Sequence, residues 1–297
     1  MIGNITDIQR FSLNDGDGIR TTIFFKGCNM HCDWCHNPET IARSNDLMFY
    51  ECNCIGCGQC FEVCKQKVHT MENDKHMLRM EKCIGCSRCV NICFAEALRF
   101  SSRSVSTEEV MEEVLQDRAY YDYSGGGVTL SGGEVFCQTD FAESIIDACV
   151  TEGINVAVET NLLNSFDKIA PVLRKLALVM FDIKLFDNEM HKKYTGTDNA
   201  IVLKNAAEID ELGIPLIVRT PLIPGVTDSD ENLLAIAEFV SKLKNVSIYE
   251  LLNFNPLGES KYKALARSNS CSDARPLSAE KLEHIRTLLK EYNVKIS

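Results

Sequence analysis

Cysteine spacing carries the clearest chemical signal in this chain. The sequence has 15 cysteines, and three of them form a tight triplet, Cys28-x3-Cys32-x2-Cys35. A cubane iron-sulfur cluster takes four cysteine ligands, so a local triplet leaves one iron with an open coordination position. Chemistry can take place at that iron, which makes the three residues candidate catalytic residues. Taken alone, such a triplet also fits a structural or a zinc-binding role.

A further set of cysteines forms two quartets that share the spacing Cys-x2-Cys-x2-Cys-x3-Cys. The quartets are Cys54, Cys57, Cys60 and Cys64, and Cys83, Cys86, Cys89 and Cys93. In two-cluster ferredoxins the fourth cysteine of each run ligates the other cluster. We therefore expect a second cluster on Cys54, Cys57, Cys60 and Cys93 and a third on Cys64, Cys83, Cys86 and Cys89. Both would act as electron relays; zinc is the alternative occupant, and Cys52 lies close enough to compete for a cluster site.

Composition limits the class of protein. With 297 residues, 45% of them hydrophobic, the chain can bury a large core. It shows neither an apolar run of membrane-span length nor a signal-type start. Its 31 basic and 42 acidic residues give a net charge of −11, which argues against a nucleic-acid partner. We expect a monomeric cytoplasmic protein without a nucleic-acid or membrane partner, whose cysteines bind metal rather than form disulfides.

The two quartets lie in an internal repeat. The segments Cys-Ile-Gly-Cys-Gly-Gln-Cys and Cys-Ile-Gly-Cys-Ser-Arg-Cys are near copies. Little apolar sequence remains around them for an independent core, so we expect the clusters to hold this segment together. The organisation that follows is a ferredoxin-like insert over residues 51–97 within a larger domain made of residues 1–50 and 98–297.

Six strand-like segments alternate with helix-like segments in the rest of the chain. The strands are expected at residues 19–26, 127–131, 154–159, 178–183, 215–220 and 246–252. Helices between them imply right-handed crossovers and a parallel sheet. The fold class is therefore α/β, and we expect a partial (β/α)6 barrel of the TIM type. A doubly wound sheet is the alternative, but the first strand-helix junction lacks a glycine-rich phosphate fingerprint.

The distinctive polar residues fall at or just after the carboxyl ends of these strands, where barrels gather their functional groups. In chain order they are the cysteine triplet, Gly132-Gly133-Glu134, Glu159-Thr160, Asp182 with Lys184, Arg219, and Asn253 with Asn255. Taken singly, Asp182 and Lys184 could also be a surface ion pair. The histidines His69, His76 and His191 are expected to face solvent.

At this point the sequence resembles the radical S-adenosylmethionine (SAM) superfamily, whose Cys-x3-Cys-x2-Cys loop it matches with Trp34 before the last cysteine. Further motifs narrow the resemblance to the glycyl radical enzyme activating enzymes, over essentially the whole chain. These motifs are Asp15-Gly16-Asp17-Gly18-Ile19-Arg20, Cys35-His36-Asn37-Pro38, Ser131-Gly132-Gly133-Glu134, Asp182-Ile183-Lys184 and Pro224-Gly225. Members with a two-cluster insert are the most similar in layout.

The resemblance implies an activity. In that family SAM chelates the open iron, and one electron cleaves it to methionine and a 5′-deoxyadenosyl radical. The radical removes a hydrogen from the Cα of one glycine in a partner, a glycyl radical enzyme. The cofactors implied are three 4Fe-4S clusters and SAM, and the electron donor is a flavodoxin or a ferredoxin.

The resemblance also implies roles for single residues. SAM would contact Trp34, Cys35, His36, Gly132, Gly133, Glu134, Asp182, Ile183, Lys184 and Asn255. Glycine would permit a close approach of SAM, and the Glu134 carboxylate would pair with its ammonium group. A monovalent cation, Na+ or K+, would lie among Glu159, Thr160, Met180 and Asp182. The partner's glycine loop would face Asp15, His36 and Arg219.

Two positions depart from the family pattern, and two other functions stay open. Asp17 replaces the usual proline, so its loop lacks that fixed φ. Asn255 stands where members often have histidine. The alternative functions are a radical SAM enzyme acting on a small molecule or peptide, and an electron-transfer protein without a catalytic site.

Overall fold

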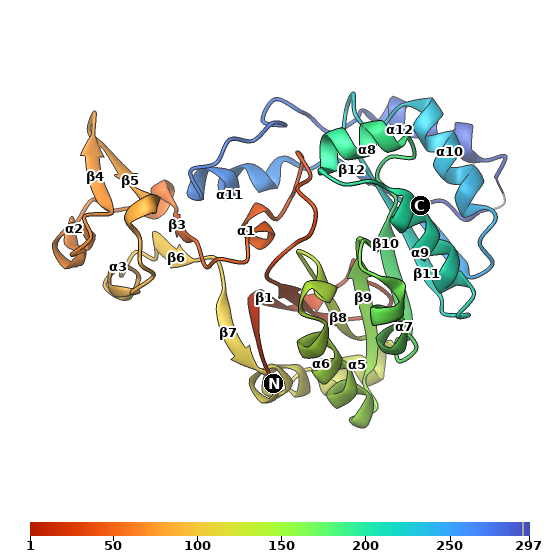
Figure 1. The fold of residues 1–297 in the computed structure, drawn as a ribbon, viewed down its shortest axis with the longest axis horizontal. Helices are drawn as coiled ribbons and strands as arrows, with labels where there is room; N and C mark the ends of the chain where they lie inside the picture. The colour runs from red at the N-terminus through yellow and green to blue at the C-terminus, as the bar shows by residue number, and fades with distance from the viewer. Residues whose placement is uncertain (293) are drawn as a thin grey trace.

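An eight-stranded sheet forms the frame of the computed structural model, which describes residues 1–292 and 294–297 (Figure 1). Its strand order is β12-β11-β10-β9-β8-β2-β1-β7. The strands are β1 (Ile2–Ser12), β2 (Arg20–Phe25), β7 (Arg103–Ser106), β8 (Gly127–Gly132), β9 (Asn155–Thr160), β10 (Leu178–Asp182), β11 (Leu216–Leu222) and β12 (Val246–Asn253). Strands β2 and β8 to β12 are parallel, which confirms the six expected strands and their order of connection.

Helices precede, connect and follow the parallel strands. They are α4 (Thr107–Leu115), α5 (Arg118–Ser124), α6 (Thr139–Thr151), α7 (Phe166–Leu173), α8 (Asn188–Thr195), α9 (Ala200–Asp210), α10 (Asp230–Val240), α11 (Glu259–Ala264) and α12 (Ala279–Leu289). Helix α4 begins with a capping box in which Ser106 and Glu109 satisfy each other's backbone N–H groups. None of the helices in the described ranges is long and apolar enough to cross a membrane.

Strands β1 and β7 were not expected, and both are antiparallel to their neighbours. Most side chains of strand β1 are accessible, and many of them are polar. The strand therefore lacks the apolar run that marks a central strand in the sequence. Gly3 and Ile5 are buried, and a Cβ on Gly3 would lie 2.0 Å from the Phe141 ring. Strand β1 therefore extends the sheet beyond β2, and β7 forms its edge.

Successive side chains of each parallel strand point to opposite faces of the sheet, and the two faces have different surroundings. Side chains such as Val158, Val179 and Val218 enter the main core beneath the helices. The alternate positions Ala157, Met180 and Ile217 form a small apolar cluster on the other face. Residues that continue this second face toward the strand ends therefore point into the interior of the partial barrel, where the candidate site lies.

The cysteine quartets lie in a small lobe beside the sheet, seen at the left of Figure 1. Strands β3 (Leu47–Phe49) and β6 (Leu98–Phe100) pair antiparallel at its base, and α2 (Gln59–Val63), β4 (His69–Glu72), β5 (Lys75–Leu78) and α3 (Arg88–Asn91) lie between them. Gly58 before α2 and Ser87 before α3 both have left-handed backbones, with φ of 74° and 61°. The sequence repeat is therefore also a repeat of backbone conformation.

The lobe has little core of its own. Its small hydrophobic cluster consists of Leu47, Val68, Cys89 and Leu98, with several other cysteines packed against them. At its base Asp46 accepts from Arg267 at 3.0 Å and lies 3.8 Å from the buried Lys26. These ion pairs tie the lobe to the sheet and to the segment after α11.

Candidate active site at the carboxyl ends of the parallel strands

A cavity of about 1000 Å³ opens at the carboxyl ends of the parallel strands. Most of the expected site residues line it, namely Asp15, Cys28, Cys32, Trp34, Cys35, His36, Gly132, Gly133, Glu159, Thr160, Asp182, Lys184, Arg219 and Asn255. Glu134, Met180 and Ile183 are not among the lining residues. The rule that places functional groups at the strand ends therefore brought together residues far apart in the sequence.

The cysteine triplet lies on a loop that follows β2, and backbone hydrogen bonds fix this loop at both ends. Cys28 N–H donates to the carbonyl of Ile41 at 3.0 Å, next to the short helix α1 (Pro38–Ile41). His31 N–H donates to the carbonyl of Thr195 at 2.9 Å, at the end of α8. The loop is thus held between two helical segments, and its three cysteines line the cavity.

Burial makes the triplet thiols poor acids, so they need a strong positive partner. Burial, with a smaller contribution from the nearby Cys32, raises the pKa of Cys28 and of Cys35 to about 12. Lys184 opposes this effect at Cys32, whose pKa burial also raises. Three converging thiols that cannot ionise alone fit a site for iron, because iron binds the thiolate form.

Gly132 and Gly133 pack against the start of the cysteine loop. Gly132 has φ of +111°, and a Cβ on it would lie 2.3 Å from the Phe25 nitrogen. A Cβ on Gly133 would lie 2.3 Å from the Gly27 carbonyl oxygen. Both positions require glycine because two backbone segments approach closely, whereas the sequence-based reason was an approach by SAM.

The Glu134 carboxylate is buried behind this glycine pair. It accepts hydrogen bonds from Thr160 Oγ1 at 2.8 Å, Asn161 N–H at 2.8 Å and Phe136 N–H at 3.1 Å. Burial raises the pKa of Glu134, although these donors lower it. The carboxylate therefore joins the ends of β8 and β9, which differs from the expected pairing with the SAM ammonium group.

Asn161 is a site residue that the sequence reasoning missed. Its amide Nδ2 donates to Asn29 Oδ1 at 2.8 Å and lies 3.8 Å from the Cys28 sulfur. Through its backbone N–H and this amide it connects Glu134 to the cysteine loop. The signal was available, since Asn161 directly follows Glu159-Thr160 at a strand end.

Asp182 and Lys184 form an ion pair inside the cavity rather than on the surface. Lys184 Nζ donates to Asp182 Oδ2 at 2.5 Å. Burial lowers the pKa of Lys184, but the Asp182 carboxylate and the nearby Cys32 sulfur raise it by more. Lys184 is therefore a permanent cation beside the cysteine triplet. Ile183 between them is buried in the main core and offers its side chain to no cavity ligand.

Arg219 lies at the centre of a second charged network. Its guanidinium donates to Glu159 at 2.9 Å, to Glu250 at 2.7 Å and to the Asn14 carbonyl at 2.8 Å. Ser131 donates to the other oxygen of Glu159. Glu250 was not expected from the sequence, although it lies opposite Arg219 in the pairing of β11 with β12. The guanidinium thus lines the cavity with its hydrogen bonds already made.

The four residues expected around a monovalent cation are occupied by other contacts. Glu159 is balanced by Arg219, and Asp182 by Lys184. The Thr160 hydroxyl donates to Glu134, and Met180 is fully buried. In this arrangement the side chains do not fit a Na+ or K+ ion.

The rim of the cavity carries the remaining expected residues. Trp34 packs on Leu185 and Ile223, with the Tyr194 ring centroid at 6.2 Å. Burial, then Lys261, lowers the pKa of His36, so this imidazole is neutral at pH 7. Asn255 accepts from Leu257 N–H at 3.0 Å. Asp15 accepts from the Thr22 hydroxyl at 2.7 Å.

In the lobe, Cys60 and Cys89 each lie near thiols from both sequence quartets. Burial raises the pKa of Cys60 to about 11, and the other thiols that raise it are Cys54, Cys57 and Cys93. Burial likewise raises the pKa of Cys89 to about 11, with Cys64 and Cys83 adding to it. Each set contains cysteines from both sequence quartets.

The expectation that three histidines face solvent is wrong for two of them. His69 is 5% exposed and His191 is 2% exposed. His191 Nδ1 lies 2.7 Å from the Thr197 carbonyl oxygen, in the turn after α8. His69 packs against His76 in the lobe, and burial together with His76 lowers the pKa of His69 to about 4.

Comparison with known proteins defines the class first. The Radical SAM superfamily profile matches residues 22–237. A radical SAM methyltransferase from Sphaerobacter thermophilus shares the fold with a TM-score of 0.55, over 99% of this chain and 76% of that one, at 13% identity. A domain of a pyruvate-formate lyase-activating enzyme from Bacteroides vulgatus covers 58% of this chain and 98% of its own, with a TM-score of 0.50 and 28% identity.

Full-length relatives narrow the class. The trans-4-hydroxy-L-proline dehydratase activating enzyme of Clostridioides difficile is 38% identical over 98% of both chains. The benzylsuccinate synthase activating enzyme of Thauera aromatica is 37% identical over 96% of this chain and 89% of its own. The choline trimethylamine-lyase activating enzyme of Oleidesulfovibrio alaskensis is 34% identical over 99% and 96%. This chain belongs to the glycyl radical enzyme activating enzymes of the radical SAM superfamily.

Proposed function

We propose that Cys28, Cys32 and Cys35 hold the 4Fe-4S cluster at which this enzyme cleaves SAM. The bound cluster supplies an open iron for the amino and carboxylate groups of SAM, together with one electron. SAM then yields methionine and a 5′-deoxyadenosyl radical, which takes a hydrogen atom from the Cα of a glycine in a partner enzyme. The observation that carries this proposal is that three partly buried cysteines and the Lys184 cation line one cavity.

The chain's own residues orient the reactants and exclude water. Trp34 and His36 would flank SAM from the cysteine loop, and Lys184 and Asp182 would contact its carboxylate and ribose. Glu134 would act as a positioning residue, since it holds Asn161 against that loop. The cavity volume is at the upper end for small-molecule sites, which leaves room for a glycine-bearing loop beside SAM. Asp15 and Arg219 line the cavity that such a loop would enter.

The lobe over residues 51–97 would carry two further 4Fe-4S clusters, within a radical SAM domain of residues 1–50 and 98–297. The crossed grouping of Cys60 with Cys93, and of Cys89 with Cys64, supports their ligand sets. A reduced flavodoxin or ferredoxin would deliver electrons to a monomeric enzyme through these clusters.

The test combines the reduced protein and SAM with the glycyl radical enzyme encoded beside it. Electron paramagnetic resonance should show a glycine-centred doublet on the partner. Cys28→Ala should abolish the doublet and leave about eight irons per chain in the lobe. A doublet that survives Cys28→Ala would contradict the assignment of the triplet, and turnover of SAM with a small molecule alone would favour the second enzyme hypothesis.

A further inference from the structure

Charge distinguishes the two cysteine sets of the lobe. The second set is Cys54, Cys57, Cys60 and Cys93, and the third set is Cys64, Cys83, Cys86 and Cys89. Eight residues directly flank the cysteines of each set in the chain. Three of those beside the third set are basic and none is acidic, whereas none of those beside the second set is charged. The basic residues are Lys65, Lys82 and Arg88.

The internal repeat of the lobe shows which residues take the same places beside the second set. Lys82 corresponds to Asn53, because each directly precedes the first cysteine of its run. Arg88 corresponds to Gln59, because each directly precedes the third cysteine. The backbone also repeats, since helices α2 and α3 both begin after a left-handed residue. The two sets therefore differ in side-chain charge rather than in conformation.

The basic side chains beside the third set are available to a partner. Lys65, Lys82 and Arg88 are exposed. Within residues 1–292 and 294–297 they take part in no ion pair, and the ion pair inside the lobe joins Arg79 to Glu72 at 3.4 Å. Ile84, between Lys82 and Arg88 in the chain, is 67% exposed. An exposed apolar residue with charged residues around it has the anatomy of a protein interface.

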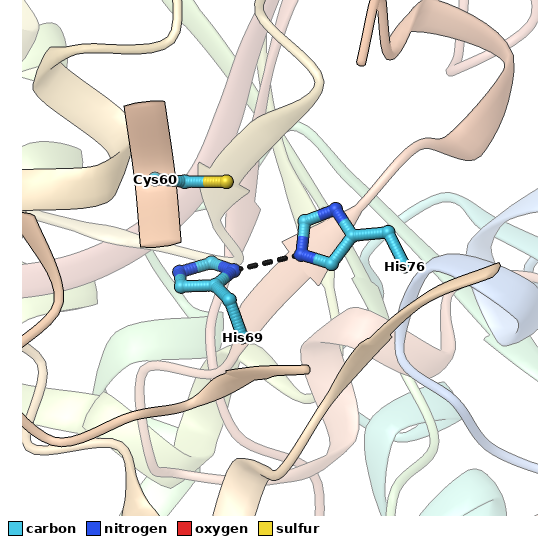
Figure 2. Close-up of side chains that lie close together, drawn as sticks. All are labelled: Cys60, His69 and His76. Atoms are coloured by element: carbon cyan, nitrogen blue, oxygen red, sulfur yellow. Dashed lines mark hydrogen bonds between the residues drawn. The ribbon is translucent and has the colours of Figure 1, made fainter. Parts of the chain in front are cut away.

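The surroundings of the second set have the opposite charge. Its four cysteines line one cavity of about 820 Å³, and the charged residues that line it with them are Glu51, Glu62, Asp74 and Lys75. His69 and His76 lie beside Cys60 and face each other, with His69 Nδ1 2.9 Å from His76 Nε2 (Figure 2). A hydrogen bond between two ring nitrogens requires that one of them carries no proton, so this pair adds at most one positive charge.

The rest of the chain repels an acidic protein. Six acidic and six basic residues balance within residues 51–97, so the net charge of −11 lies outside the lobe. Local charge of opposite sign attracts and orients a partner, and charge of the same sign opposes its approach. The face around the third set is therefore the part of the lobe that an acidic protein would approach.

We propose that Lys65, Lys82 and Arg88, around Ile84, form the docking face for an acidic one-electron carrier protein. One electron then leaves the carrier, which is oxidised, and reduces the cluster held by the third set, without transfer of a proton or a bond. This inference rests on the proposed function, because it requires clusters in the lobe. It adds which set receives the electron and the charge of the carrier that delivers it.

The first experiment measures binding to the unaltered full-length chain with its clusters in place. Calorimetry gives the Kd for an oxidised acidic ferredoxin at about 10 mM and about 150 mM salt, where charges act over about 30 Å and about 8 Å. The Kd should rise at least about tenfold with the added salt. An affinity that does not change with salt would overturn the proposal.

Two double variants with the same net charge locate the docking face. Lys82→Gln with Arg88→Gln removes two positive charges beside the third set, and Asn53→Asp with Gln59→Glu adds two negative charges at the equivalent places beside the second set. At about 150 mM salt the first pair should raise the Kd about tenfold and the second less than about twofold. An equal or larger effect of the second pair would contradict docking at the third set. Both proteins should hold about twelve irons.

Electron transfer separates the carrier from other occupants of this face. Reduced ferredoxin should reduce the clusters of Lys82→Gln with Arg88→Gln about tenfold more slowly, whereas photoreduced deazaflavin, which carries no surface charge to be matched, should reduce them at the unaltered rate. Glycyl radical formation with deazaflavin should also be unaltered. Its loss in this variant would place the glycyl radical enzyme on the face and overturn the proposal.

Failure of the proposed function gives a different result. In that case the unaltered chain with deazaflavin and SAM forms no glycyl radical. The ferredoxin Kd needs neither SAM nor the glycyl radical enzyme, so its dependence on salt and on Lys82 and Arg88 still decides for or against the docking face.

Discussion

At the residue scale, Lys184 is the cation on which the cysteine site depends most. It lies beside Cys32 and pairs with Asp182 at 2.5 Å. Lys184→Met should weaken SAM binding about 10- to 100-fold, because a charged hydrogen bond is lost and Asp182 stays unpaired in a buried place. Equilibrium SAM binding to the reduced enzyme measures this.

The matched control is Lys242→Met, which removes an exposed ion pair with Glu238 on α10. It should leave SAM affinity unchanged, since such pairs contribute little. Equal affinities for the two variants would show that Lys184 has no role in binding.

The Arg219 network predicts both a stability change and a pH dependence. Arg219→Met leaves Glu159 and Glu250 without their cation, so unfolding free energy should fall by about 3–5 kcal/mol. Burial raises the pKa of Glu159, but Arg219 and Ser131 lower it by more, and its net pKa is below the usual value. Because the pKa of Glu159 is lower in the folded chain than in the unfolded chain, its ionised carboxylate stabilises the fold at pH values above the unfolded pKa. This stabilisation is lost as the pH falls through the folded pKa.

Denaturant unfolding at matched cluster loading, between about pH 6 and pH 3, tests both effects. The unaltered chain should lose more stability than Arg219→Met over this range. Adding Glu159→Gln to Arg219→Met should recover part of the loss. A pH profile that is the same with and without Arg219 would contradict the network.

The sequence identified site residues by their chemical type, whereas it did not predict which residues they contact. The cysteines, Asp182, Lys184 and Arg219 stood out because their types and strand-end positions are unusual. Asn161 was missed because an amide just after a strand is ordinary until its contacts with Glu134 and Asn29 are known. Glu250 was missed because a carboxylate on a strand is ordinary until the register of β11 and β12 places it opposite Arg219. The contacts of Glu134 depend on the turn after β8, which the sequence pattern does not specify.

At the element scale, the approach of β8 to the cysteine loop controls cluster assembly. Gly133→Ala would place a Cβ 2.3 Å from the Gly27 carbonyl oxygen, so one of the two segments must move. Iron should fall from about twelve to about eight per chain, with loss of the SAM-induced spectral change. Iron analysis and spectroscopy of the reconstituted enzyme report the result.

Gly153→Ala is the control for this change. It also has a positive φ, of 69°, but a Cβ there meets nothing within 4 Å. It should cost about 1 kcal/mol of stability and leave iron near twelve. Full iron in Gly133→Ala would mean that this close approach is not needed.

Strands could be located from the sequence where their burial requires a regular pattern of apolar residues. The six parallel strands are apolar on both faces or alternate clearly, so they could be located. Strand β1 could not, because its accessible side chains remove that signal. The β4–β5 hairpin was not predicted, since Asn-Asp is a less distinctive turn than Asn-Gly.

At the scale of the whole molecule, the lobe and the sheet should be separable. Phe49 and Leu98 are paired where the lobe begins and ends, so a short turn can replace residues 51–97. The shortened chain should keep about four irons and still cleave SAM with a chemical reductant. It should lose activity with reduced flavodoxin or ferredoxin, because the proposed relay is gone.

Asp46→Asn in the otherwise unaltered chain tests whether anchoring of the lobe matters by itself. It weakens the contacts to Lys26 and Arg267 while retaining both cysteine sets. Its iron should remain near twelve. A shortened chain that accepts electrons from the protein donor as fast as the full chain would contradict the relay.

The central claim is that a hydrogen atom moves from a partner's glycine to the 5′ carbon of SAM. The most direct test uses a partner glycyl radical enzyme whose glycines carry deuterium at Cα, mixed with the reduced enzyme and SAM. Mass spectrometry of the 5′-deoxyadenosine should find one deuterium for each glycyl radical formed. Glycyl radicals that appear while the 5′-deoxyadenosine remains unlabelled would contradict the account.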